Sequence, residues 1–206
     1  MKIAIIGGTG KLGLALAKRL HQSGYDVMIG SRDASKALQA ARSIAENIGG
    51  DTNTAAAEWC DAAFVSVPYQ GHRLMLEPLK VALRGKVLID ATVPIDPANM
   101  LQIKTESGKS AAEESLTLLP ETNVFAGFHT ISHRVLAVLT SSHDVLVAGS
   151  AQRKSEVIEL IRSMNLRPID SGPIEVAGHL ERLTVLLLSI NKANKVKESG
   201  IKITGI

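Results

Sequence analysis

Short apolar runs alternate along this chain with longer stretches in which apolar residues recur at helical spacing. Strands are predicted where the runs are nearly continuous in aliphatic residues, at 2–6, 26–29, 62–67, 86–90 and 123–128. Parallel strands that are covered on both faces have this composition. Repeated alternation of strand and helix predicts an α/β fold built on a doubly wound parallel sheet.

The stretches between these runs are expected to be helical, with two exceptions. Helices are predicted over 11–23, 34–48, 55–60, 71–83 and 111–119, the last beginning at a capping box formed by Ser110 and Glu113. A short third strand is expected near Thr52, after the glycine pair that ends the second helix. Residues 96–106 have no clear period and are expected to form a loop.

The C-terminal part of the pattern adds two strands and two helices. Strands are predicted over 143–148 and 166–170, and helices over 152–164 and 176–195. The last helix is apolar almost all round between Leu183 and Ile190. We therefore expect it to be buried, either against the sheet or against a second subunit, as in a homodimer that associates through this helix.

A glycine-rich turn separates the first strand from the first helix. Gly8, Gly10 and Gly13 satisfy G-x-G-x-x-G, the fingerprint of a Rossmann-type dinucleotide site, and they stand where that site needs them. The first two glycines let the backbone approach a pyrophosphate, and the third lets the helix pack closely. We expect residues 1–150 to form the nucleotide-binding domain and residues 151–206 a small C-terminal helical lobe that completes a second-substrate cleft.

The end of the second strand indicates which dinucleotide binds. NAD sites carry Asp or Glu about 20 residues after the fingerprint, to bind the ribose 2′-hydroxyl. This chain has Ser31 and Arg32 there, with Lys36 one helical turn later. A hydroxyl and two cations would hold a 2′-phosphate, which a carboxylate would repel. The sequence therefore favours NADP(H), although an ordinary solvated Arg at a capped helix start would look the same.

Composition restricts the class of protein further. The net charge is +3 and the aromatic content 3%, without a basic run or basic residues interleaved with aromatics, which argues against a nucleic-acid partner. The single Cys60 excludes an internal disulfide and is expected to be an inert core thiol, and no Cys/His cluster has metal-ligand spacing. No signal peptide or membrane-spanning run is recognised, so a cytoplasmic location is expected.

Polar residues at strand ends are the candidates for chemistry. His129, beside Thr130, is the best candidate for a group facing a reactive centre, although a structural histidine is the commoner role of such a residue. No Tyr-x-x-x-Lys or Ser-x-x-x-Lys pair and no Lys-His-Asp set is present. A hydride acceptor that is itself a cofactor carries out the redox chemistry, so it would need the protein to position it more than to supply acid–base catalysis.

As an ordered set, these motifs resemble the coenzyme F420-dependent NADP reductases over essentially the whole length. The matching segments are Ile6 to Gly13, Gly30-Ser31-Arg32 with Lys36, Ser110 to Glu113, His129-Thr130-Ile131, Asp170 to Pro173, Glu181 with Leu183-Thr184, and Gly200 to Ile203. The resemblance implies reversible hydride transfer between NADP(H) and the deazaflavin coenzyme F420, which stacks on the nicotinamide. It also implies a small C-terminal lobe and a dimer.

The resemblance further implies roles for single residues. By motif, the pyrophosphate would contact Thr9, Gly10, Lys11 and Leu12, and the 2′-phosphate would contact Ser31, Arg32 and Lys36. Further cofactor contacts would come from Tyr69 and His133, and the residues near the deazaflavin would be His129 and Thr184. Where the family commonly has Arg, this chain has Gly178, and Arg182 takes a position that is often small and polar. A basic residue in this region is expected to help hold the acidic part of the deazaflavin.

Two other functions use the same dinucleotide site. One is NADPH-dependent reduction of a flavin, an imine or a metal-bound acceptor. The other is a non-catalytic NADP-binding sensor, which would need no open second pocket. A cavity beside the nicotinamide, lined by His129 and the last helix, would favour the deazaflavin.

Overall fold

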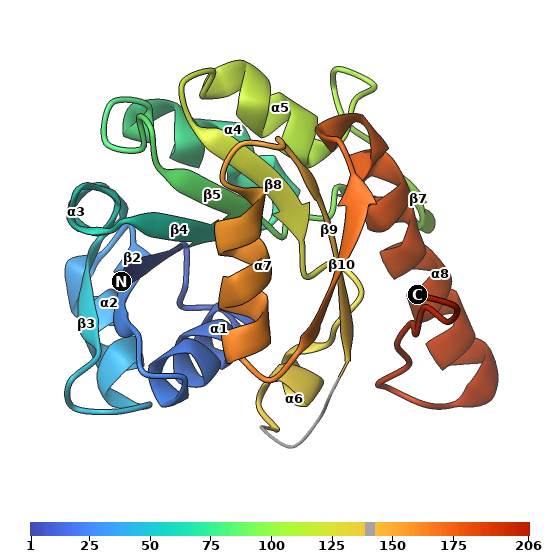
Figure 1. The fold of residues 1–206 in the computed structure, drawn as a ribbon, viewed down its shortest axis with the longest axis horizontal. Helices are drawn as coiled ribbons and strands as arrows, with labels where there is room; N and C mark the ends of the chain where they lie inside the picture. The colour runs from blue at the N-terminus through green and yellow to red at the C-terminus, as the bar shows by residue number, and fades with distance from the viewer. Residues whose placement is uncertain (139–142) are drawn as a thin grey trace.

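The computed structural model describes residues 1–138 and 143–206 and is built on an eight-stranded sheet in the order β10-β9-β8-β5-β4-β1-β2-β3 (Figure 1). The strands are β1 (Lys2–Ile6), β2 (Asp26–Ser31), β3 (Gly49–Thr52), β4 (Ala62–Val65), β5 (Val87–Asp90), β8 (Asn123–Gly127), β9 (Asp144–Gly149) and β10 (Arg167–Gly172). From β3 to β8 all neighbouring pairs are parallel, in the strand order of dinucleotide-binding sheets. β9 is antiparallel to β8, and β10 is parallel to β9.

Helices cover both faces of this sheet, so the fold class predicted from the sequence is confirmed. One face carries α1 (Lys11–Gln22), α2 (Ala34–Arg42), α6 (His133–Leu136) and α7 (Lys154–Ser163). The other carries α3 (Asn53–Trp59), α4 (His72–Leu76), α5 (Ala111–Leu118) and α8 (Ala177–Asn194). The strands β1, β2, β4, β5, β8 and β9 contribute side chains to the cores on both faces, because successive side chains of a strand point to opposite faces.

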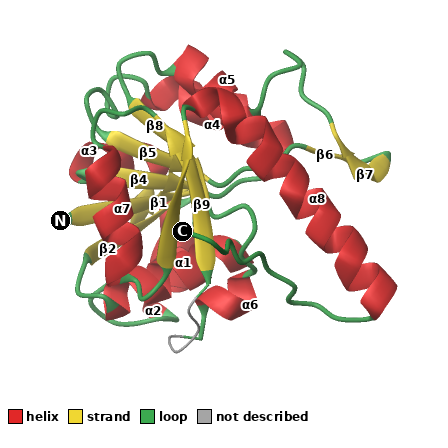
Figure 2. Ribbon diagram, turned by 45° about the vertical axis from the view of Figure 1, so that its right-hand side comes forward, coloured by secondary structure: helices red, strands yellow, loops and turns green. Residues whose placement is uncertain are grey.

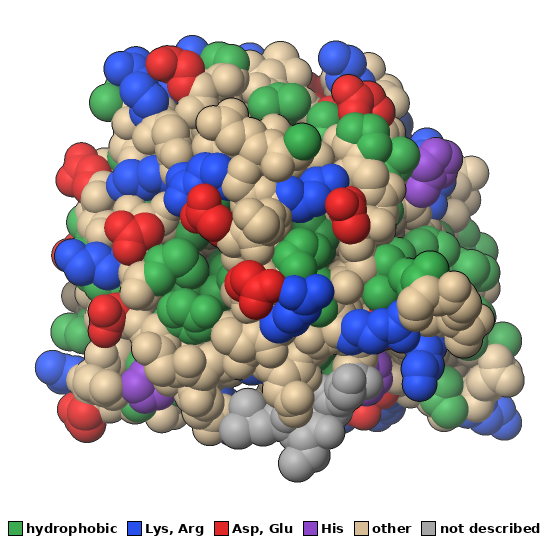
Figure 3. Space-filling model, viewed as in Figure 1, with side chains coloured by type: hydrophobic (Ala, Val, Ile, Leu, Met, Phe, Trp, Pro, Cys, Tyr) green, Lys and Arg blue, Asp and Glu red, His purple; other side chains and the backbone are tan. Residues whose placement is uncertain are grey.

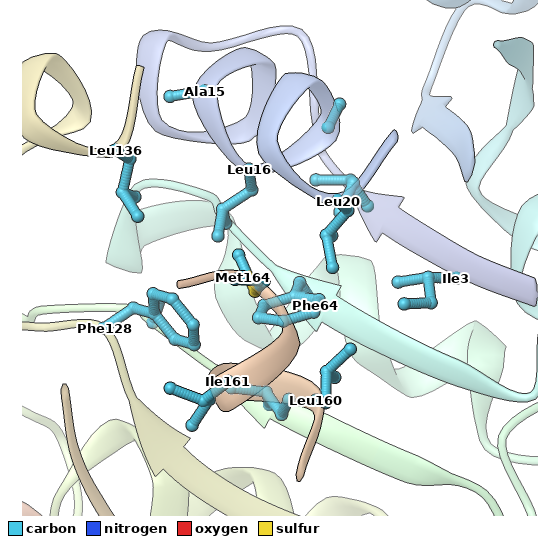
Figure 4. Close-up of a cluster of buried hydrophobic side chains, with 14 of the residues drawn as sticks. Ile3, Ala15, Leu16, Leu20, Phe64, Phe128, Leu136, Leu160, Ile161 and Met164 are labelled. Atoms are coloured by element: carbon cyan, nitrogen blue, oxygen red, sulfur yellow. The ribbon is translucent and has the colours of Figure 1, made fainter. Parts of the chain in front are cut away.

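The core on the α1 face is built around Phe64 of β4. Its ring meets that of Phe128 edge to face, with centroids 5.3 Å apart. Leu16 and Leu20 of α1 approach from one side and Leu160 and Ile161 of α7 from the other (Figure 4). The two helices are thus held to the sheet by aliphatic packing around an aromatic pair.

A buried cation also joins α1 to this face. Arg19 is 0% exposed, and its Nε donates to the carbonyl oxygen of Met164 at 2.6 Å. Its Nη1 donates to the carbonyl oxygens of Leu136, at 3.2 Å, and Val138, at 3.0 Å. Arg19 therefore binds carbonyls at the C-terminal ends of α6 and α7, where a positive charge is favoured.

Three predicted elements differ from the structure. The helix expected over 34–48 ends at Arg42, and Gly49 and Gly50 begin β3. A Cβ on Gly50 would lie 2.4 Å from the amide nitrogen of Leu38, so this glycine allows β3 to pass closely under α2. The helix expected over 71–83 breaks after Leu76 into a 3-10 turn (Glu77–Leu79) that contains Pro78, which lacks an N–H donor.

The loop expected over 96–106 contains a small antiparallel ribbon. It consists of β6 (Ile95–Asp96) and β7 (Asn99–Ile103), and β7 packs against α8. In Figure 2 the second half of α8 runs away from the sheet beside this ribbon. Leu186, Leu188 and Ile190 are 53%, 40% and 38% exposed, so one side of the apolar part of α8 stays uncovered although Val185 and Leu187 are buried.

Charged residues of both signs are mixed over the face that Figure 3 shows. On α7 they form pairs, as in the 2.7 Å contact of Arg153 with Glu156, and Lys154 lies 2.7 Å from Asp170 of β10. Within residues 1–138 and 143–206, no helix is long and apolar enough to cross a membrane.

The division expected at residue 150 falls between β9 and α7. β10, which lies in the C-terminal part, pairs with β9 in the same sheet, whereas the second half of α8 runs away from the sheet. The division into residues 1–150 and 151–206 stays a prediction.

Candidate active site

The glycine turn after β1 is held in place by its backbone. Gly7 has a φ of +67°, and a Cβ there would lie 2.1 Å from Cγ1 of Val67. The Gly7 N–H donates to Oδ1 of Asn53 at 3.0 Å, and the Gly8 N–H donates to the carbonyl oxygen of Gly30 at 2.9 Å. The turn is therefore fixed against β2, β4 and α3 before any ligand binds.

The N-terminus of α1 is open beneath this turn. Its N-cap residue, Gly10, makes no side-chain cap, and no acidic residue stands in the first turn. A Cβ on Gly10 would meet nothing within 4 Å. Helix N-termini bind anions through free N–H groups and the helix dipole, so a pyrophosphate fits the space beside Gly10.

A cavity of about 820 Å³ extends from this turn along the carboxyl ends of the neighbouring strands. Four predicted cofactor-binding residues line it together: Thr9, Gly10, Ser31 and Arg32. Thr52 and Asn53 line it from the end of β3 and the start of α3, and Ser66 to Pro68 line it from the end of β4. The structure thus brings the glycine turn and the expected 2′-phosphate site into one cavity, at the switch point between β1 and β4 where dinucleotides bind.

Asp33 follows Arg32 and is the acidic residue nearest to the expected 2′-phosphate site in sequence. Its Oδ1 accepts hydrogen bonds from the N–H groups of Ser35, at 2.9 Å, and Lys36, at 3.2 Å. Asp33 is therefore the N-cap of α2 and does not line the cavity. Its carboxylate accepts hydrogen bonds from N–H groups at the start of α2. At the end of β2, the charged residue that lines the cavity is therefore the exposed Arg32.

The other predicted cofactor residues are not among the residues that line this cavity. Gly8 is buried under the turn, Lys11 and Leu12 open α1, and Lys36 is exposed in the first turn of α2. Tyr69 lines a neighbouring cavity of about 650 Å³, where its hydroxyl donates to Oε2 of Glu114 at 2.9 Å. His133 is the first residue of α6, whose N-cap is Ser132.

His129 and Thr184, the two residues expected near the second substrate, are brought together. Phe128 turns the chain sharply after β8, with a φ of +67°. The Thr184 hydroxyl, on α8, then donates to the backbone carbonyl oxygen of His129 at 2.8 Å. Burial lowers the pKa of His129 to about 4, so its ring is neutral at pH 7. The charge of Asp90 and the backbone of Thr92 favour the charged ring but do not outweigh burial.

A buried polar cluster at the end of β5 was not foreseen. Oδ2 of Asp90 lies 2.7 Å from Nε2 of His72, and it accepts a 2.5 Å hydrogen bond from Ser115. Oδ1 accepts from the N–H of Thr92 at 2.9 Å. The same His72 nitrogen, Nε2, faces both Asp90 and, at 3.0 Å, the Ser115 hydroxyl, which itself donates to Asp90. The histidine therefore does not bridge the serine and the acid through its two nitrogens, as a relay that activates a serine requires.

The charges of this pair follow from its contacts. Burial alone would raise the pKa of Asp90, but His72 and the hydrogen bonds outweigh burial and lower the pKa to about 2. Burial alone would lower the pKa of His72, but the charge of Asp90 raises it. Each partner therefore stabilises the charged form of the other, and their contact fastens α4 to the sheet. The sequence feature that could have pointed to this cluster is Asp90, an acidic residue at the end of the otherwise apolar strand β5.

Glu181 of α8 is a second buried acid, which the sequence marked only as part of a family motif. It is 0% exposed, and its Oε1 accepts a 2.8 Å hydrogen bond from the N–H of Ala111. Cys60 is buried as expected, and burial raises the pKa of its thiol. Within the described residues, no three His, Cys, Asp or Glu side chains are grouped to hold a metal ion.

Comparison with known proteins identifies the family. The model of the family "NADP oxidoreductase coenzyme F420-dependent" matches residues 2–94. The F420-dependent NADP reductase of Methanothermobacter marburgensis is 40% identical, over 100% of this chain and 99% of the relative. That of Methanocaldococcus jannaschii is 34% identical, over 100% of this chain and 99% of the relative.

A crystal structure from Arthrobacter sp. FB24 has the same fold, with a TM-score of 0.90 over 100% of both chains at 24% identity. The agreement of the two full-length relatives with the family model means that this chain belongs to the F420-dependent NADP reductase family.

Proposed function

We propose that this protein transfers a hydride reversibly between NADP(H) and the deazaflavin coenzyme F420. The observation that carries the proposal is the single cavity that joins the open N-terminus of α1 to Ser31 and Arg32. The cavity has the donors that a dinucleotide with a 2′-phosphate requires. The relatives that match this chain over its full length are F420-dependent NADP reductases, and they indicate F420 as the second substrate.

In this proposal the residues of the chain bind the cofactor and orient it. Thr9, Gly10, Lys11 and Leu12 hold the pyrophosphate at the start of α1, and Gly8 gives the turn its close approach. Ser31, Arg32 and Lys36 hold the 2′-phosphate. Tyr69 and His133 make further cofactor contacts from the two flanks of the site. NADPH, when bound, supplies a hydride from its nicotinamide, and F420 accepts it.

His129 and Thr184 define the acceptor side. The 2.8 Å hydrogen bond between them ties the chain after β8 to α8, so residues 1–150 and the lobe 151–206 meet at this point. A neutral, buried imidazole can donate or accept a hydrogen bond without carrying a charge. We assign both residues to orienting the deazaflavin, with little acid–base chemistry from the protein.

The exposed apolar part of α8 supports a homodimer. Leu186, Val185 and Leu101 line a hollow of about 530 Å³ between α8 and β7. Met100 and Leu101 of β7 are 58% and 62% exposed, next to the exposed leucines of α8. Contiguous apolar residues of this kind are typical of protein interfaces, and we assign them to a second copy of this chain.

The test of the activity is an absorbance assay with NADPH and three acceptors. We expect reduction of F420, measured as loss of the absorbance of its oxidised form, and slow or no reduction of riboflavin derivatives and cyclic imines. NADPH oxidation with a flavin or an imine but not with F420 would assign the chain to another reductase activity. Tight NADPH binding without turnover of any acceptor would indicate a sensor.

A further inference from the structure

Glu181 joins two helices from inside the protein. Its side chain is 0% exposed, and Oε1 accepts a 2.8 Å hydrogen bond from the N–H of Ala111, the first residue of α5. Close packing surrounds this contact, since a Cβ on Gly178 would lie 3.8 Å from Cβ of Ser110, the N-cap of α5. The carboxyl group therefore fastens the first half of α8 to the start of α5.

Thr184 lies on the same side of α8 as Glu181, because residues three apart in a helix are neighbours on one face. The Thr184 hydroxyl donates to the carbonyl oxygen of His129 at 2.8 Å. α8 is thus fixed at two successive points, first to α5 and then to the chain after β8. A change at the first point moves the second, because a helix is a rigid element over one turn.

We infer that Glu181 is a positioning residue for the second substrate: its carboxyl group fastens α8 to α5 and so fixes Thr184 and the backbone of His129. This inference rests on the proposed function, since it concerns the acceptor side of the site. Glu181 needs no contact with the substrate to act in this way.

Burial, reinforced by nearby negative charges, favours the protonated form of Glu181. Burial raises its pKa to about 8, and repulsion from Asp90 of β5 and Glu113 of α5 acts in the same direction. Hydrogen bonds from the Ala111 and Ala112 N–H groups lower the pKa of Glu181, but they do not outweigh burial and the repulsion. Arg182, the neighbouring cation on α8, is exposed and donates to the carbonyl oxygen of Gly178 at 3.2 Å.

Ionisation of Glu181 would place a second anion inside the protein near Asp90. Asp90 is already ionised and paired with His72, while His129 is neutral. In the part of the chain that the structure describes, no ion pair involves Glu181 or compensates its charge. A buried, unpaired carboxylate is costly, so we expect the contact between α8 and α5 to loosen in mildly alkaline solution.

The kinetic test compares Glu181→Gln, Glu181→Ala and the exposed control Glu175→Gln between about pH 6 and about pH 9. Glutamine keeps a neutral acceptor for the Ala111 N–H, whereas alanine removes it. We expect Glu181→Ala to raise the KM for F420 roughly tenfold, with the KM for NADPH changed less than about twofold. The wild type and the control should show a rise of the F420 KM above a pH of about 8, and Glu181→Gln should lack that rise.

Two kinetic results would overturn the inference. One is a Glu181→Gln variant as impaired as Glu181→Ala at neutral pH, which would mean that a carboxylate is required. The other is an equal loss for NADPH and F420, which would make Glu181 a support of the whole fold.

Thermal unfolding without substrates tests the protonation state separately. The unfolded acid ionises near pH 4.5 and the folded acid only near pH 8, so folding takes up a proton between these values. Stability of the wild type relative to Glu181→Gln should therefore fall as pH rises through this window. A constant difference would mean that Glu181 is ionised, and the inference would fail. If the wild type does not reduce F420 at all, the proposed function fails, and this measurement alone decides the state of Glu181.

Discussion

Gly13 of α1 packs directly under Gly8 of the turn. A Cβ on Gly13 would lie 2.5 Å from the carbonyl oxygen of Gly8 and 2.6 Å from its Cα, closer than atoms can approach. Gly10 is different, since a Cβ there would meet nothing within 4 Å. The glycines of one fingerprint therefore serve two needs, close packing of the helix at Gly13 and open space for a ligand at Gly10.

This difference predicts opposite effects of the same substitution. Gly10 has φ −81° and ψ 171°, which any residue adopts, so Gly10→Ala should leave the melting temperature nearly unchanged. Its methyl group would occupy the space assigned to the pyrophosphate, and we expect NADPH affinity, measured by fluorescence titration, to fall at least about tenfold.

Gly13→Ala is the matched comparison. It should lower the free energy of unfolding by about 1–3 kcal/mol, because the backbone must shift to admit the methyl group. Unchanged NADPH binding in Gly10→Ala would mean that the pyrophosphate does not lie beside Gly10.

Arg32 should determine the choice between NADPH and NADH. A charge-assisted hydrogen bond contributes about 1.5–3 kcal/mol, so Arg32→Glu should weaken NADPH binding by roughly 10- to 150-fold. NADH has no 2′-phosphate, and its dissociation constant should change little. Arg42→Glu, in the last turn of α2, makes the same charge change away from the cavity and should leave both constants unaltered. Equal losses for NADPH and NADH would contradict a 2′-phosphate role for Arg32.

Local signals explain why the dinucleotide side could be predicted from the sequence. The turn follows β1 directly, and Ser31 and Arg32 end β2, so strand ends and glycine spacing place them in one cavity. The capping box of Ser110 and Glu113 is equally local, and both of its hydrogen bonds are present. These features depend on a few neighbouring residues and on the known order of strands in such a sheet.

Contacts between distant residues could not be predicted in this way. His72, Asp90 and Ser115 come from three elements, and only the packing of α4 and α5 on β5 brings them together. The ribbon β6–β7 has no alternation of apolar and polar residues, because four of the five β7 side chains are exposed. The antiparallel direction of β9 is likewise fixed by the chain connection and not by the composition of the strand.

The ion pair of His72 and Asp90 should stabilise the fold within a limited pH range. The lowered pKa of Asp90 contributes stability above 3.8 that is lost as pH falls towards about 2. The raised pKa of His72 contributes stability below 6.5 that is lost as pH rises through its folded value. The contribution of the pair is therefore largest between 3.8 and 6.5.

Replacing His72 would leave the Asp90 carboxylate buried without its partner. His72→Leu keeps a side chain of similar size, and we expect the free energy of unfolding in urea to fall by about 3–5 kcal/mol within this pH range. Ser115→Ala removes the hydroxyl that donates to Asp90 and lies 3.0 Å from Nε2 of His72, but it leaves the charged pair in place and should cost about 1 kcal/mol. A loss for His72→Leu that does not vary with pH would show that packing, and not charge, fastens α4.

The second half of α8 should hold two copies of this chain together. We expect the wild type to be a dimer in size-exclusion chromatography with light scattering, and Leu186→Glu to shift it to a monomer, because a charge would enter the apolar interface. Leu186 is 53% exposed in the single chain, so the substitution should leave the folded monomer intact. Val81 is 76% exposed and lies outside α8 and β7, which makes Val81→Glu the matched control that should remain dimeric. A monomeric wild type, or dissociation by both substitutions, would refute an interface built on α8.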